Sequence, residues 1–259
     1  MNGDSTEAPM APTPELLEYL CRMKSTKRKL VAVAGPPASG KSTFARALCD
    51  SLNKVGVHAE TVPMDGFHLD NRLLDTRGLR ARKGAPETFD VQGFVTLIMR
   101  LKQGEEVVYP IFDRERDQAI AGAGMVAKSC EIAIVEGNYL LFDEPVWSSL
   151  ASLWDFSIWI ETPLQVVRDR CIARWCTHGH TPEDARARAE TNDLENARRV
   201  INARLQATMT LADHQAFGPG ACGSLGTDWQ LKATGGEPHD QCPETAKRIE
   251  RACCGYWQP

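Results

Sequence analysis

Short apolar runs rich in β-branched residues alternate along the chain with longer segments whose apolar residues recur at helical spacing. The short runs predict strands buried in a sheet, and they lie at residues 29–34, 57–62, 106–109, 131–135 and 156–160. The predicted helices begin near residues 14, 41, 90, 163, 182 and 193, and the last of them is expected to reach residue 211. Strands that alternate with helices favour an α/β fold with a central parallel sheet and helices on both faces.

Three of these helices start at a threonine that precedes a proline. The hydroxyl of Thr13, Thr162 or Thr181 can cap the first turn, and proline fits the first helical position. Residues 71–86 and 110–128 are rich in charge and poor in apolar positions, so both segments are predicted to be long loops.

The two ends of the chain depart from the alternating pattern. Residues 1–12 are polar and contain prolines, which predicts a flexible tail. Residues 214–259 are rich in glycine, proline and cysteine and have no sustained apolar period, which predicts a poorly ordered extension. The folded domain is therefore expected to cover residues 13–213.

Composition narrows the class of protein. The 259-residue chain suits one α/β domain with appendages, and its net charge of −4 gives no support to nucleic-acid binding. No apolar stretch approaches the ~18 residues that a membrane helix needs, and the N-terminus lacks the layout of a signal peptide. Nine cysteines occur without a C-x-x-C pair, so we expect free thiols and a cytoplasmic location.

A phosphate-binding loop follows the first predicted strand and precedes a predicted helix. Such a loop turns successive backbone N–H groups toward a triphosphate, and the helix N-terminus adds partial positive charge. Lys41 supplies a cation for the β- and γ-phosphates, and Ser42 offers a hydroxyl to Mg²⁺. The residues expected to bind ATP are Gly35, Pro36, Pro37, Ala38, Ser39, Gly40, Lys41, Ser42 and Thr43.

Two acidic residues follow other predicted strands. Because parallel strands end at one edge of the sheet, Asp65 and Glu136 are expected near the phosphate loop. Asp65 can accept the proton of an acceptor hydroxyl, and the alternative is that it orients a metal-bound water. Glu136 is the candidate for the Mg²⁺ shell, and a capping or salt-bridged carboxylate is its alternative.

Arginines cluster on a predicted helix near the end of the domain. Arg170 and Arg174 lie four positions apart and share one helix face, with Arg168 close to it. These side chains could neutralise charge on a transferring phosphoryl group, or they could form a solvated basic face.

Several longer motifs carry a family resemblance. They lie at residues 64–71 (MDGFHLDN), 82–90 (RKGAPETFD), 110–117 (PIFDRERD), 135–141 (VEGNYLL), and at Asn192, Asp193 and Asn196. With these motifs, residues 15–211 resemble the phosphoribulokinase, uridine kinase and bacterial pantothenate kinase superfamily. The nearest likeness is to its nucleoside-kinase-like branch described as fructose transport system kinases.

The resemblance implies a P-loop NTPase fold of three layers with a helical lid at about residues 168–192. It implies that Asp65 is the general base and that Arg170 and Arg174 act from or beside the lid. Lys41 of the phosphate loop is the remaining catalytic candidate, from its motif. The resemblance also suggests that the segment around Arg82 and Lys83 and the loop with Asp113 and Arg114 line an acceptor pocket. His68 and Tyr109 are further candidates for this pocket. A plain hydrogen-bonding role is the alternative for His68.

These observations predict a kinase that transfers the γ-phosphoryl group of ATP, with Mg²⁺, to a hydroxyl of a small molecule. A sugar, a nucleoside and a pantothenate-like compound all stay open as acceptors, and a homodimer is one assembly open to it. The alternative is an ATPase or nucleotide-gated binding protein without an acceptor. The discriminating residue is Asp65, because a pure switch does not need a base beside an acceptor pocket.

Overall fold

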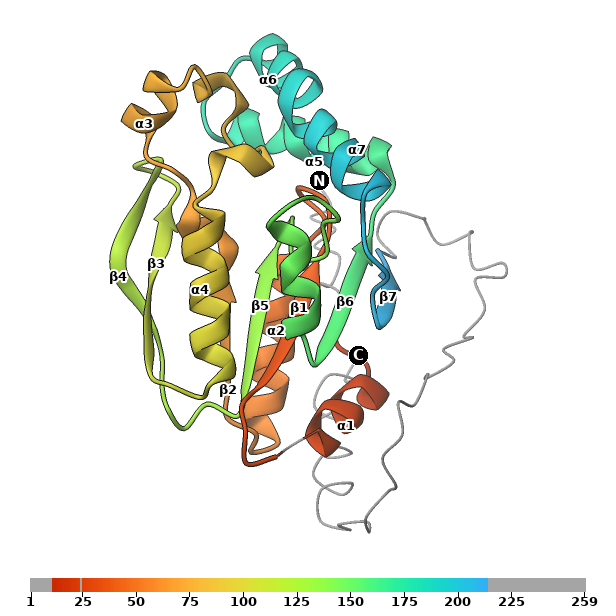
Figure 1. Cartoon of the computed structure of the whole chain (residues 1–259). Helices are drawn as coiled ribbons and strands as arrows, with labels where there is room; N and C mark the ends of the chain where they lie inside the picture. Colours follow the sequence, from red (N-terminus) through yellow and green to blue (C-terminus); the bar gives the residue numbers. More distant parts are fainter. Residues whose placement is uncertain (1–10, 24, 214–259) are drawn as a thin grey trace, which may run out of the picture.

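Five parallel strands form the central sheet of the protein. In the computed structural model, which describes residues 11–23 and 25–213, their order is β2-β5-β1-β6-β7. The strands are β1 (Lys29–Ala34), β2 (Ala59–Pro63), β5 (Ile132–Gly137), β6 (Phe156–Glu161) and β7 (Met209–Ala212). Every adjacent pair is parallel, so all five C-terminal ends lie at one edge (Figure 1).

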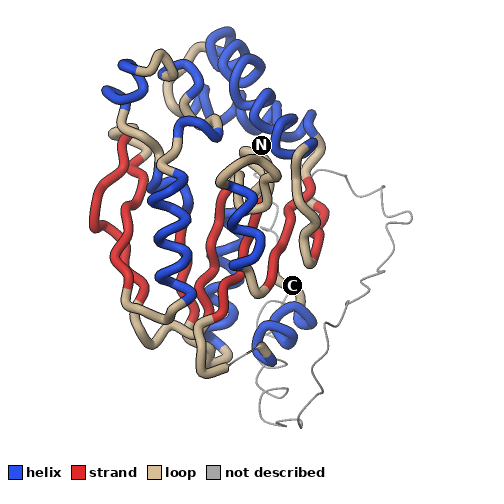
Figure 2. The backbone as a smooth tube through the Cα atoms, in the orientation of Figure 1, coloured by secondary structure: helices blue, strands red, loops and turns tan. Residues whose placement is uncertain are grey.

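Helices cover both faces of this sheet and complete the expected three layers. The helices α1 (Pro14–Arg22) and α2 (Lys41–Lys54) pack on one face, and α4 (Val91–Lys102) packs on the other (Figure 2). The side chains of β1 divide accordingly: Leu30 and Ala32 join the core beneath α4, whereas Val31 and Val33 join the core beneath α2. A strand buried on both faces is continuously apolar, which explains why the sequence pattern located it.

A helical layer lies above the C-terminal edge of the sheet. It consists of α5 (Leu164–Thr177), α6 (Pro182–Arg188), a π-helical turn (Ala189–Asp193) and α7 (Leu194–Asn202) (Figure 1). These elements share a small core of their own, formed by Val167, Cys171, Ala189, Leu194 and Ala197. The segment expected to be the lid thus sits over the edge where the phosphate loop and the acidic residues emerge.

The prediction of a loop at residues 110–128 is wrong. This segment completes an antiparallel hairpin of β3 (Val107–Asp113) and β4 (Gln118–Val126) beside the main sheet. The register shifts between Tyr109 and Ile111, around a proline that has no N–H to donate. Small residues in β4 hide its strand character, yet Gly124 is needed there because an added Cβ would lie 2.4 Å from the ring of Tyr109.

Two further predictions need correction. Residues 71–86 are not a plain loop, since they contain α3 (Asn71–Thr76) and short 3₁₀ turns at Arg80–Arg82 and Pro86–Thr88. The helix expected over 193–211 ends at Asn202, and the chain then adds β7 to the sheet edge beside β6. A four-residue strand is too short to show a period, so only its pairing with β6 reveals it.

The threonine caps are confirmed in two of three places. Thr13 and Thr181 accept hydrogen bonds from the N–H groups of Leu16 and Asp184 at 3.3 and 3.1 Å. Thr162 does not cap α5, and its hydroxyl is buried without a hydrogen-bond partner. The predicted tail lies almost wholly, and the extension at 214–259 entirely, outside the described residues. Across residues 11–23 and 25–213, we find no helix with the length and apolar character needed to cross a membrane.

Candidate active site

The loop between β1 and α2 is shaped for a phosphate chain. Gly40 has a φ of 82°, in the left-handed region, and α2 begins there without a side-chain cap. A Cβ on Gly35 would lie 2.7 Å from the Ser39 hydroxyl and 3.1 Å from the carbonyl oxygen of Ile160. The loop therefore packs tightly on the end of β6 and leaves the first N–H groups of α2 for an anion.

Three observations test whether this loop fits ATP and Mg²⁺. The Ser39 hydroxyl is buried without a partner, and the α2 N-terminus has no side-chain cap. The carboxylate of Glu136, at the end of β5, accepts a hydrogen bond from the hydroxyl of Ser42. A hydroxyl beside a carboxylate is the oxygen pair that holds Mg²⁺ in P-loop proteins, so these residues fit both groups.

Lys41 and Glu136 form the charged centre of the site. Burial lowers the pKa of the Lys41 ammonium, and the carboxylates of Glu136 and Asp65 oppose this shift. Burial raises the pKa of Glu136, and the charge of Lys41 offsets it only in part. Burial therefore disfavours the charged form of both side chains. A bound triphosphate would place negative charge beside Lys41, and a bound divalent cation would place positive charge beside Glu136.

Asp65 lies in a short 3₁₀ turn directly after β2, in Met64–Phe67. Arg114 donates a hydrogen bond to its carboxylate at 2.8 Å. Burial alone would raise the pKa of Asp65, but its electrostatic interactions with His68 and with the cations Arg114 and Lys41 outweigh that effect and lower the pKa. Asp65 is thus ionised at neutral pH, whereas the pKa of Glu136 is raised. Two neighbouring carboxyl groups whose pKa values are shifted in opposite directions typically have different roles in a reaction.

Gly66 explains why a glycine follows Asp65. A Cβ at this position would lie 1.9 Å from the carbonyl oxygen of Pro110 in β3. The glycine therefore serves close packing between the 3₁₀ turn and the hairpin, and this contact brings the hairpin end with Arg114 next to Asp65.

His68 is wedged beside Asp65. Its Nδ1 lies 2.8 Å from the carbonyl oxygen of Asp65, and its ring lies between the rings of Phe89 and Phe112, at centroid distances of 4.1 and 4.6 Å. Burial lowers the pKa of His68, so the imidazole is neutral at pH 7. With Nδ1 donating to the carbonyl, Nε2 is left as an acceptor.

Lys83 ties three segments together. Its ammonium donates to Asn71 Oδ1 at 2.7 Å and to the Asp117 carbonyl oxygen at 2.7 Å, and it lies 2.8 Å from the Asp117 carboxylate. Asn71 also donates to that carboxylate, at 2.8 Å. These contacts hold the hairpin turn at Asp117, a non-glycine residue with a φ of 52°, against α3.

The helical layer contributes a second group of side chains. Arg174 and the indole N–H of Trp175 donate to the two carboxylate oxygens of Asp193, at 3.3 and 2.6 Å. The guanidinium of Arg188 lies over the Trp175 ring, 4.1 Å from its centroid. The ring of His180 meets the same indole edge-on at 5.4 Å.

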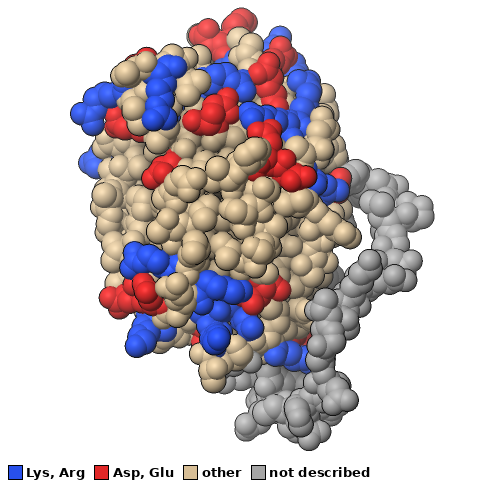
Figure 3. Space-filling model, viewed as in Figure 1, with Lys and Arg blue, Asp and Glu red and all other residues tan. Residues whose placement is uncertain are grey.

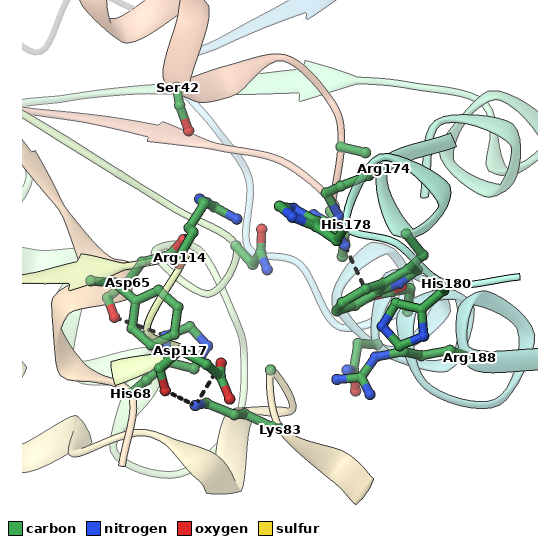
Figure 4. A pocket seen from close by; sticks show the side chains of 18 of the residues that line it. Ser42, Asp65, His68, Lys83, Arg114, Asp117, Arg174, His178, His180 and Arg188 are labelled. Atoms are coloured by element: carbon green, nitrogen blue, oxygen red, sulfur yellow. Dashed lines mark hydrogen bonds and ion pairs between the residues drawn. The ribbon is translucent and has the colours of Figure 1, made fainter. Parts of the chain in front are cut away.

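Both groups face one cavity of about 480 Å³ (Figure 4). Asp65, His68, Lys83, Arg114 and Asp117 lie on one side of it, opposite Arg174, His178, His180 and Arg188. Lys41, Ser42, Pro37 and Ala38 contribute the phosphate-loop wall. Figure 3 shows charges of both signs at the end of the molecule that carries α3 and α6 and again at the opposite end, with a largely uncharged band between them.

Glu136 and five residues of the phosphate loop (Gly35, Pro36, Ser39, Gly40 and Thr43) do not line this cavity. Among the expected acceptor residues and the two expected catalytic arginines of the helical layer, four more do not line it. Tyr109 donates to the Thr61 carbonyl at 2.9 Å, and Arg82 pairs with Glu195 at 2.6 Å. Asp113 accepts from the N–H groups of residues 115 and 116, both at 3.0 Å, and so shapes the hairpin turn. Arg170 donates to the Ala38 carbonyl at 3.3 Å and forms an ion pair with Asp213.

Sequence reasoning missed other cavity residues. It did not single out Trp175, His178 or His180, yet all three line the cavity. Trp175 directly follows Arg174, which is a usable signal once that arginine is a candidate. Asp117 and Asn138 lie in the motifs at residues 110–117 and 135–141 but were not named as site candidates, whereas Arg188 lies on α6, outside those motifs.

Comparisons with known proteins agree with this geometry. A family model described as "Phosphoribulokinase / Uridine kinase family" matches residues 30–211. The protein YggC of Escherichia coli (strain K12) is 36% identical over 201 residues, which cover 76% of this chain and 83% of that protein. A Schizosaccharomyces pombe protein named "Putative uridine kinase" is 34% identical over 184 residues, with coverages of 67% and 78%.

A solved structure is also similar. It is described as a "putative fructose transport system kinase" from Silicibacter sp. TM1040. The two chains are 52% identical, with a TM-score of 0.74, and the match covers 76% of this chain and 98% of the other. Sequence and fold therefore point to the same group of proteins.

Proposed function

The chain belongs to the phosphoribulokinase/uridine kinase family, and on that premise we propose that it transfers the γ-phosphoryl group of ATP to a hydroxyl of a small molecule, with Asp65 as general base. The observation that carries this proposal is the position of Asp65. Its carboxylate faces the same cavity as Lys41 and Ser42 of the phosphate loop, and the pKa of this carboxyl is lowered. A hydroxyl placed between Asp65 and the loop would meet a base on one side and a phosphate on the other.

The reaction then needs little covalent participation from the protein. The acceptor hydroxyl gives its proton to the Asp65 carboxylate while its oxygen forms a bond to the γ-phosphorus. The bond between that phosphorus and the bridging oxygen breaks, and ADP leaves with the electron pair. Lys41 and the N–H groups at the start of α2 stabilise negative charge on the phosphates throughout.

Ser42 and Glu136 would hold Mg²⁺, which supplies charge neutralisation at the β- and γ-phosphate oxygens when bound. In the helical layer, Arg174 lines the cavity, and we assign it the role of neutralising negative charge on the phosphoryl group during transfer. Arg170 lies outside the cavity and contacts the Ala38 carbonyl, so we assign it a positioning role on the phosphate loop.

A direct test separates binding from chemistry. Asp65→Asn should abolish phosphorylated product while ATP binding is kept, because the amide cannot take the proton and the phosphate loop is untouched. Lys41→Ala should lose turnover as well, and Lys54→Ala, an exposed site in the last turn of the same helix, is the matched control. A fully active Asp65→Asn enzyme would exclude Asp65 as the base.

The alternative remains an ATPase or nucleotide-gated binding protein. It would use the same loop and Glu136 but would consume ATP at one rate with or without an added acceptor. Product analysis by mass spectrometry decides between the two functions, because a phosphorylated small molecule appears only if a kinase is at work.

A further inference from the structure

Arg114 and Asp65 form an ion pair inside the cavity. The guanidinium Nη2 donates to the carboxylate Oδ2 at 2.8 Å, and the Asp65 side chain is only 27% exposed. Arg114 directly follows β3, and Figure 4 shows it beside Asp65, on the side of the cavity that also carries His68, Lys83 and Asp117 (the acceptor half). The proposed base is therefore occupied by a cation before any acceptor enters.

This contact weakens Asp65 as a base. Arg114 is held to the carboxylate by the attraction of opposite charges as well as by a hydrogen bond, whereas a neutral hydroxyl offers only the hydrogen bond, so it competes poorly with Arg114. While the pair persists, Arg114 also helps to keep the pKa of Asp65 low, and a low pKa reduces its power to accept a proton. An acceptor must draw Arg114 away from Asp65 to use that carboxylate fully.

Lys83, the other cation in this half of the cavity, is already committed. Its ammonium has three donors, and the structure gives it three oxygen partners, on Asn71 and Asp117. The side chain is 6% exposed and lies 5.0 Å from the centroid of the Phe112 ring. Lys83 thus fixes the hairpin turn, whereas Arg114 is 56% exposed and has room to move toward a ligand.

We propose that the acceptor carries an anionic group, a carboxylate or a phosphate, near the hydroxyl that is phosphorylated, and that Arg114 binds this group. The inference rests on the proposed kinase function. Binding of the acid exchanges one anionic partner of Arg114 for another, so its charge stays paired. The same exchange frees the Asp65 carboxylate for the hydroxyl, and neutral sugars and nucleosides are disfavoured because they cannot drive it.

The test uses the full chain and a metabolite extract of Escherichia coli. The extract is separated on an anion exchanger into neutral and acidic fractions. Each fraction is incubated with the protein, Mg²⁺ and ATP that carries ¹⁸O in its γ-phosphoryl group. We expect a labelled product from the acidic fraction only. Phosphatase treatment of that fraction beforehand distinguishes the two sources of charge, because it destroys a phosphate ester acceptor and spares a carboxylic acid.

The acceptor so found is then measured with variants. Arg114→Gln should raise its KM by roughly 10- to 100-fold, the loss expected for one charged hydrogen bond, with the KM for ATP unchanged. Arg116→Gln is the matched control, since Arg116 lies in the same turn, faces Asp113 at 3.6 Å and does not line the cavity.

Each outcome decides a different claim. A product from the neutral fraction, or equal loss in the Arg114 and Arg116 variants, would overturn the anionic acceptor while leaving a kinase in place. ATP hydrolysis without product in either fraction would overturn the kinase function and this inference with it. A product from the acidic fraction that is lost in Arg114→Gln supports both.

Discussion

Arg174 donates a hydrogen bond to Asp193 at 3.3 Å, across the junction between α5 and the π-helical turn. The Asp193 side chain is 10% exposed and binds the Trp175 indole N–H with its other oxygen. Asp193 therefore aims an arginine and anchors the aromatic ring beside it, which connects the irregular turn to the cavity wall.

This arrangement predicts unequal losses in two variants. Arg174→Ala should lower kcat by about 1,000-fold, the scale for an arginine that stabilises a transferring phosphoryl group. Asp193→Asn should cost about tenfold, because an amide oxygen still accepts one hydrogen bond but carries no charge. Steady-state kinetics with saturating ATP measures both values.

Arg168→Ala is the control for this pair. Arg168 lies on the same helix but binds Glu190 at 2.7 Å and does not line the cavity. It should keep the activity of the unmodified protein. Equal losses in the Arg168 and Arg174 variants would mean that the helix face acts only through its stability.

His68 predicts a pH dependence of stability. Burial lowers the pKa of His68 below its ordinary value of 6.5, so in the window just below 6.5 the unfolded chain binds more protons than the folded one. The contribution of His68 is therefore unfavourable to folding at acidic pH, and stability falls as the pH drops below about 6.5. The His68→Asn variant lacks this titrating group, so the free energy of unfolding of the variant should fall less between pH 7.5 and pH 5.5 than that of the unmodified protein.

Urea unfolding at the two pH values measures the difference and cancels the packing lost in the variant. His178→Asn, an exposed position on the helical-layer side of the cavity, is the comparison and should follow the unmodified protein. Identical pH dependence in the His68 variant and the unmodified protein would contradict the assignment.

Substitution of Arg28, a buried residue that does not line the cavity, is predicted to destabilise the folded protein strongly. Its guanidinium is buried and donates to four backbone carbonyls, those of Leu101, Glu105, Ala127 and Cys130. Arg28→Met leaves these acceptors unpaired and should lower the free energy of unfolding by about 3 kcal/mol. For a domain of this size the melting temperature should fall by roughly 10 °C.

Thermal unfolding followed by circular dichroism measures this loss. Lys27→Met, at the exposed preceding residue, should change the melting temperature by no more than a degree or two. A similar loss in both variants would show that the cost comes from the added apolar surface and not from the four carbonyls.

The sequence predicted best where local chemistry and burial agree. The continuous apolar runs of β1 and β5 follow from burial on both faces, and Thr13 and Thr181 cap helices through contacts within three residues. A loop that wraps its backbone around an anion needs a glycine where φ is positive and a cation for the phosphates. Gly40 and Lys41 could therefore be identified from the sequence alone.

It predicted poorly where pairing across the chain decides the outcome. The strand β4 consists largely of small residues and is a strand because β3 lies beside it, and β7 exists because β6 offers a free edge. The candidate acceptor residues divided for the same reason: Arg114 and Lys83 reach the cavity, whereas Tyr109 turns to Thr61 and Arg82 to Glu195.

By itself, then, the sequence determined that this protein has a parallel α/β fold with a phosphate loop and acids at one sheet edge, since these depend on periodicity and local backbone geometry. The tertiary structure alone decided the partners of the charges: Arg114 with Asp65, Arg174 with Asp193, and Lys83 with Asp117. An ion pair acts over a few ångströms of space and is indifferent to distance along the chain, so no motif encodes it.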